Sequence, residues 1–143
     1  MAKLTGRSIV GFADGDEASE RFYAINPANG QRLQPGYSPA KAADVEQAAQ
    51  LAAEAFRVYG CTSGRERGAF LRAIAANIES LTSELVERAH QETALPPGRL
   101  QGETARTCGQ LRLFAQVAEE GSWVGARIDR ADPDRKPAAK PDP

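Results

Sequence analysis

Helical periodicity runs almost without interruption through residues 43–120, and it limits the possible fold more than any other feature of this sequence. Apolar residues recur there at the spacing i, i+3, i+4, i+7 that marks one face of an α-helix. Breaks between these stripes predict four amphipathic helices, over residues 43–59, 63–81, 83–93 and 98–120. Many of the apolar positions are alanine, and aromatic residues are only 6% of the chain. Because alanine supplies little bulk, these helices must pack very closely on one another or against another part of a protein.

Local signals set the ends of the predicted helices. Residues 63–66 (Ser-Gly-Arg-Glu) form a capping box, in which Ser63 and Glu66 would each accept a backbone N–H of the other. Thr82 or Ser83 is expected to cap the third helix. Gly60 and Gly121 are expected to end the first and fourth helices, because glycine adopts the left-handed conformation readily.

The first 36 residues indicate strands and turns in place of helices. Short β-branched or aromatic runs predict strands over residues 8–12 and 22–26, with a turn at residues 14–16 after the first of them. Residues 29–30 are Asn-Gly, and both tolerate a positive φ, so they predict a hairpin whose return strand is residues 31–33.

The last 22 residues, 122–143, are predicted to begin an arm or a linker. Residues 122–128 are compatible with one more strand. Residues 132–143 contain four prolines in twelve positions and no large apolar side chain, so they are expected to form an extended linker. Since a protein rarely ends on a linker, the chain is expected to be truncated.

The composition excludes several classes of protein. Eighteen basic residues balance 19 acidic residues, and this near-neutral charge argues against a nucleic-acid surface or a polybasic membrane anchor. No apolar run approaches the ~20 residues of a membrane helix, and the first ten residues lack the apolar core of a signal peptide. Two cysteines do not make a disulfide framework, so a cytoplasmic protein is expected.

No motif for a nucleotide or a metal is present. The sequence contains neither a Gly-x-Gly-x-x-Gly fingerprint nor a P-loop. Residues 14–17 are acidic, but their spacing is wrong for a calcium loop and favours a turn. His90 is the only histidine and has no partners for a zinc site or a catalytic triad, so it is interpreted as a packed or surface residue.

The two cysteines are the remaining candidates for chemistry. Cys108 lies on the apolar stripe of the fourth predicted helix, with no activating group on its face, so it is interpreted as a small packing residue. Cys61 falls between two helices and is interpreted as an exposed loop thiol. The sequence therefore predicts no catalytic, cofactor-binding or metal-binding residue in the chain.

Several of these segments resemble parts of NAD(P)-dependent aldehyde dehydrogenases. Residues 24–31 (Ala-Ile-Asn-Pro-Ala-Asn-Gly-Gln) look like the hairpin near the start of that family. The resemblance covers residues 8 to about 128 in the right order. Within the family, residues 23–37 and 92–106 look most like the 2,5-dioxovalerate (α-ketoglutarate semialdehyde) dehydrogenase branch. Three further segments resemble the first, second and third helices of the family, namely residues 44–56, 65–76 and 85–93, with Ala94 where many members have glycine.

The resemblance implies an α/β fold in which residues 37–121 are the helical part of the cofactor-binding domain. It also implies a cysteine nucleophile in a Gly-Gln-x-Cys-like context and a glutamate base in a Glu-Leu-Gly-Gly-Lys-like context. Neither motif occurs in the 143 residues, so no catalytic residue is carried over. The full-length family uses NAD or NADP, acts on an aldehyde and is expected to form homo-oligomers, whereas this segment alone is expected to bind no cofactor and to be inactive.

A different class of protein also fits the pattern. Four amphipathic helices behind a β-hairpin could form a small helical interaction module that stands alone and has no catalytic activity. The two interpretations make opposite predictions for the apolar stripes. A segment of an enzyme would leave part of them exposed, whereas a complete bundle would bury them. The candidates for exposure in a segment are the large side chains Val45, Phe56, Phe70, Ile74, Leu111 and Phe114, some of which must pack on one another.

Overall fold

The computed structural model describes residues 4–126 and 134, and its described part is mostly α-helical. Each of the four predicted helices is confirmed to within one residue at both ends. The elements in chain order are β1 (Ile9–Val10), β2 (Ala13–Asp14), α1 (Ala42–Tyr59), α2 (Gly64–Ser80), α3 (Thr82–Thr93), α4 (Pro97–Glu120) and the short 3-10 helix η1 (Ser122–Val124).

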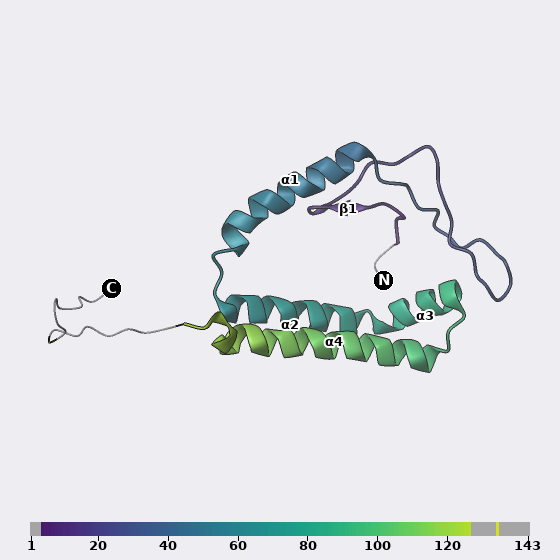
Figure 1. Cartoon of the computed structure of the whole chain (residues 1–143). Helices are drawn as coiled ribbons and strands as arrows, with labels where there is room; N and C mark the ends of the chain where they lie inside the picture. The colour runs from purple at the N-terminus through teal and green to yellow at the C-terminus, as the bar shows by residue number, and fades with distance from the viewer. Residues whose placement is uncertain (1–3, 127–133, 135–143) are drawn as a thin grey trace.

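Helices α2 and α4 lie side by side and antiparallel, and α3 continues from the end of α2 along the start of α4 (Figure 1). Helix α1 and β1 lie together in a separate layer, away from α2 and α4, and a short loop joins α1 to α2 (Figure 1). The molecule therefore has two parts, a helical unit of α2, α3 and α4 and a layer that contains the N-terminal residues and α1.

The helix ends agree with the sequence in part. The capping box at α2 is confirmed, because the Glu66 N–H donates to Ser63 Oγ at 3.2 Å and the Ser63 N–H donates to the Glu66 carboxylate at 2.7 Å. Gly121 ends α4 in the left-handed conformation, with φ of 74°, as predicted.

Gly60 ends α1 as predicted but not in the predicted left-handed conformation, and the predicted cap of α3 does not form. Gly60 follows α1 with a right-handed φ of −59°, and its N–H bonds to the carbonyl of Phe56. Neither Thr82 nor Ser83 caps α3, because the chain passes from α2 into α3 with only Leu81 between them. The Thr82 hydroxyl instead donates to the Glu79 carbonyl at 2.8 Å.

The N-terminal strands are shorter than predicted. In the β1–β2 hairpin Ile9 pairs with Asp14 and Val10 with Ala13, so the tight turn lies at residues 11–12 and not at 14–16. The second hairpin is reduced to two isolated antiparallel bridges, Ile25 to Arg32 and Phe22 to Tyr37.

The turn of the second hairpin is built from Asn26 and Gly30. The Asn26 carbonyl accepts the Gly30 N–H at 2.8 Å, and its side chain accepts the Ala28 N–H at 2.9 Å. Gly30 has a φ of 72°, but Asn29 has a negative φ, so only one residue of the Asn-Gly pair takes the predicted conformation. The Asn26 side chain stabilises the start of the turn and leaves a single left-handed position for glycine.

The strand predicted over residues 122–128 does not form where the structure describes it, because Ser122–Val124 make the 3-10 helix η1. Trp123 turns back onto α4, where its indole N–H donates to the Val117 carbonyl at 3.0 Å. Residues 127–128 of this predicted strand lie outside the described residues. The predicted linker over residues 132–143 also lies outside them, apart from Asp134.

The core lies between the three helices of the helical unit and consists of small side chains. Its buried hydrophobic residues are Ala75, Val86, Cys108 and Ala115. No leucine, isoleucine or phenylalanine in the described part of the chain is buried. The small side chains allow α2 and α4 to approach so closely that a Cβ at Gly64 would overlap the Ala118 carbonyl oxygen.

Candidate functional site: the exposed apolar surfaces

Cys108 is a packing residue of the helical unit. Only 1% of it is exposed, and its Sγ lies 3.6 Å from the Ala75 carbonyl oxygen on α2. The predicted packing position is confirmed. Cys61 is exposed in the loop after α1, as predicted.

His90 and the acidic residues 14–17 have structural partners. His90 Nδ1 lies 2.7 Å from the Leu95 carbonyl oxygen, where the chain leaves α3. Asp16 pairs with Lys41 at 3.1 Å, and Glu17 bridges Arg7, at 2.6 Å, and Arg21. Among residues 4–126 and 134, no three His, Cys, Asp or Glu side chains gather as metal ligands would. In the same residues, no helix has the length and apolar character needed to cross a membrane.

The N-termini of α1 and α2 are occupied by carboxylates and do not fit the pyrophosphate of a dinucleotide. Such a group binds where the first amides of a helix are free and are approached through glycine. The Glu66 carboxylate already lies at the start of α2, and the Asp44 carboxylate at the start of α1 accepts the Lys41 N–H at 2.8 Å. Helix α4 begins on Pro97, which has no amide hydrogen.

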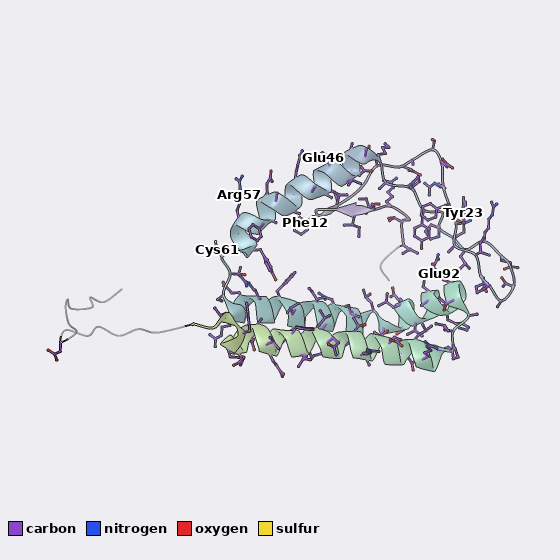
Figure 2. All side chains as sticks on the ribbon, in the orientation of Figure 1. Phe12, Tyr23, Glu46, Arg57, Cys61 and Glu92 are labelled. Atoms are coloured by element: carbon purple, nitrogen blue, oxygen red, sulfur yellow. The ribbon has the colours of Figure 1, made fainter. Side chains whose placement is uncertain are left out.

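Helix α1 and the β1–β2 turn present an apolar surface to solvent. No residue of α1 is buried, so its entire predicted stripe is exposed. Phe12 at the turn is fully exposed, and it lies with the alanine-rich side of α1 around a hollow of about 550 Å³ (Figure 2). We define the α1 surface by its exposed large side chains, which are Ile9, Phe12, Val45, Phe56 and Val58.

The helical unit carries a second exposed apolar set. Phe70 is 53% exposed on α2 and Phe114 is 58% exposed on α4. Leu71, Leu111 and Phe114 line a hollow of about 460 Å³ between these two helices. Of the six candidates for exposure, Val45, Phe56, Phe70 and Phe114 are exposed. Ile74 and Leu111 are half-buried, as expected for the members of this set that pack between the helices, because they flank Ala75 and Cys108 at that contact.

Two bidentate ion pairs join α2 to α4 beside this core. Arg112 Nη1 and Nη2 donate to the Glu79 carboxylate at 2.7 and 2.6 Å, and Arg72 holds both oxygens of Glu119. Hydrogen bonds from Arg112 lower the pKa of Glu79, and hydrogen bonds from Arg72 lower the pKa of Glu119. Sequence reasoning missed both pairs, because their partners are 33 and 47 residues apart and have no local signal.

Comparison with known proteins places these features in one family. The model of the aldehyde dehydrogenase family matches residues 12–139. The chain is 43% identical to alpha-ketoglutaric semialdehyde dehydrogenase 2 of Azospirillum brasilense over 98% of its length. It is 47% identical to alpha-ketoglutaric semialdehyde dehydrogenase of Acinetobacter baylyi over 99% of its length. The chain spans 27% of the length of each of these two relatives.

A solved structure shows the same fold. The crystal structure of an NAD-dependent benzaldehyde dehydrogenase from Corynebacterium glutamicum superposes on 95% of this chain and 28% of its own, with a TM-score of 0.65 and 21% sequence identity. The fold, the match to the family model and the two relatives agree with the resemblance carried by the hairpin and the helices. The chain belongs to the aldehyde dehydrogenase family.

Proposed function

We propose that this chain supplies residues of the cofactor-binding domain to an aldehyde dehydrogenase that oxidises α-ketoglutarate semialdehyde (2,5-dioxopentanoate) to the carboxylate with NAD or NADP. The observation that carries the proposal is the 43–47% identity, over nearly the whole chain, to two relatives that are named for this substrate. In this proposal residues 37–121 are the helical part of that domain.

The role of this segment is structural. The α1 surface and the exposed residues Phe70 and Phe114 are too apolar to remain in water without a cost, because each large side chain that packs contributes about 1.5–3 kcal/mol. We therefore propose that both surfaces pack against the remainder of a longer polypeptide. Its full-length form would be a cytoplasmic homo-oligomer, which agrees with the two free cysteines.

The segment contributes no catalytic residue in this proposal. Neither the Gly-Gln-x-Cys nor the Glu-Leu-Gly-Gly-Lys context occurs in the sequence, and the Cys108 thiol is buried against α2. Carboxylates occupy the N-termini of α1 and α2, and the sequence lacks a dinucleotide fingerprint, so the isolated chain is expected to bind neither NAD nor NADP.

A chimera tests the proposed function. The matched 27% of the Acinetobacter baylyi relative is replaced by this chain, and oxidation of 2,5-dioxopentanoate is followed by the absorbance of the reduced nicotinamide. We expect activity in the chimera. A matched chimera that carries Val45→Glu and Phe56→Glu on the α1 surface is expected to be inactive or insoluble. A soluble chimera without activity would contradict the proposal.

The isolated chain provides the second half of the test. It is expected to form no NADH or NADPH with the semialdehyde, and Cys108→Ser is expected to change nothing catalytic. Aldehyde-dependent reduction of the nucleotide that is abolished by Cys108→Ser would overturn the structural role of Cys108.

A further inference from the structure

The N-terminal arm, which we define as residues 4–41, makes its polar contacts with the helical unit around one arginine of α3. Arg88 Nε donates to Glu92 Oε1 at 2.6 Å, and Nη2 donates to the Tyr37 hydroxyl at 3.1 Å. Nη1 donates to the Gln34 carbonyl, and the guanidinium lies 5.8 Å from the centroid of the Tyr37 ring. All the polar contacts of this junction therefore involve Arg88 or its partner Glu92.

The residues that Arg88 holds are themselves tied to the rest of the arm. Phe22 and Tyr37 exchange two backbone hydrogen bonds, at 3.0 and 2.7 Å, and their rings stack with centroids 5.6 Å apart. Arg21 donates to the Gly36 carbonyl at 3.1 Å, and the Ser38 N–H donates to the Gly6 carbonyl at 2.8 Å. Residues 34–38 are therefore joined by these contacts to Gly6, Arg21 and Phe22 of the arm.

The arm continues into α1, whose only other attachment to the helical unit is at the α1–α2 loop. There the rings of Tyr59 and Phe70 meet edge to face at 5.9 Å, and Arg67 donates to the Gly60 carbonyl at 3.0 Å. Between these two ends α1 buries no residue, and its main packing partner is β1. The polar contacts between this layer and the helical unit thus lie at two points, Arg88 and residues 60–63.

We propose that the contacts of Arg88 fix this layer over the helical unit. When these contacts are broken, the arm and α1 move as one body about residues 60–63. The planar guanidinium satisfies a carbonyl, a phenol and a carboxylate at the same time. Lysine carries the same charge but cannot hold three acceptors in this geometry. The inference concerns how the layer is held and does not depend on the proposed activity.

Distances between paired spin labels test the proposal. In a Cys61→Ser background, one pair joins Ala28→Cys on the arm to Gln101→Cys on α4, and a second pair joins Ala28→Cys to Glu20→Cys within the arm. The labelled chain is diluted with unlabelled chain so that distances between copies do not contribute, and circular dichroism checks that each variant keeps its helices.

With Arg88→Ala we expect the distance from the arm to α4 to shift and broaden while the distance within the arm stays unchanged. Arg88→Lys should give an intermediate shift, and Tyr37→Phe should give a smaller one because the ring remains. Arg106→Ala, on α4 and without an ion pair among the described residues, is the matched control and should change neither distance.

Three outcomes would overturn the proposal. If neither distance changes in Arg88→Ala, the apolar residues around the groove near Leu4 and Leu85 hold the arm. If both distances broaden, the arm unfolds and does not move as a body. If Arg88→Ala loses the helical circular dichroism signal and both defined distances, Arg88 stabilises the fold of the whole chain and does not act only on the position of the layer.

Discussion

At the residue scale, Ala94 adopts a conformation that suits glycine. It ends α3 with φ of 57° and ψ of 13°, and its N–H bonds to the His90 carbonyl at 2.8 Å. A residue with a Cβ pays roughly 1–2 kcal/mol in this left-handed region, whereas glycine enters it freely. The sequence resemblance had placed Ala94 where many family members have glycine, and the backbone explains that preference.

Ala94→Gly is therefore expected to raise the free energy of unfolding by about 1 kcal/mol, measured by urea denaturation. The matched control is Ala105→Gly in the middle of α4, where the helix requires an ordinary conformation. That variant should lower the free energy of unfolding by roughly 0.5–1 kcal/mol. The conformation assigned to Ala94 would be wrong if both glycines destabilised the chain equally.

At the scale of elements, the α2–α4 contact depends on Gly64. A methyl group there would overlap the backbone oxygen of Ala118, which cannot rotate away. Gly64→Ala should lower the free energy of unfolding by about 1–3 kcal/mol, although alanine is the better helix former. Gly109→Ala, on α4 with open space around its Cβ, should instead raise it by about 0.5–1 kcal/mol. Thermal melts of both variants provide the measurement, and stabilisation by both would show that α2 and α4 do not approach closely at Gly64.

The contact between α2 and α4 is also expected to weaken in acid. Arginine lowers the pKa of Glu79 and of Glu119 below the ordinary value of 4.5. A lowered folded-state pKa contributes stability that is fully present above pH 4.5 and is lost as the pH falls through the folded-state pKa. Urea midpoints measured from pH 6 downward should therefore begin to fall below about pH 4.5.

The double variant Glu79→Gln with Glu119→Gln should flatten this acid dependence. Added salt should also reduce it, because both pairs are exposed to solvent. Glu54→Gln on α1 is the matched control, since Glu54 makes no ion pair in the part of the chain that the structure describes. An unchanged acid slope in the double variant would mean that other carboxylates cause the loss.

At the scale of the whole molecule, the exposed apolar surfaces should govern behaviour in solution. Monomeric proteins rarely expose apolar patches beyond a few hundred Å². The isolated chain is therefore expected to bind a hydrophobic dye, to self-associate in sedimentation and to melt over a broad temperature range. Phe56→Ser with Val45→Ser on the α1 surface should reduce dye binding, whereas Ala28→Ser on the arm should leave it unchanged. A monodisperse monomer with a sharp melt and no dye binding would favour the stand-alone helical module.

The helices could be predicted from the sequence because their signals are local. The stripes, the Ser63 capping box and Gly121 act within one or two helical turns, so the four helices and their ends were found. Thr82 was misjudged as a cap because the tertiary contact of α3 with α4 allows α2 to run almost directly into α3. The buried position of Cys108 could be predicted because Cys108 lies on the apolar stripe of the fourth helix. The contact of Arg88 with Gln34 could not be predicted, because the two residues are 54 positions apart and no local pattern links them. The same is true of the ion pairs between α2 and α4.

The small side chains of the core also fix how the chain responds to temperature. Because the fully buried hydrophobic residues are small, unfolding hydrates less apolar surface than in most proteins, so its heat-capacity increment should fall below the usual ~12–15 cal/mol/K per residue. A small increment gives a shallow stability curve without a pronounced optimum. The folded population then varies little between cold and warm conditions, and it is set chiefly by mass action with whatever polypeptide covers the exposed surfaces.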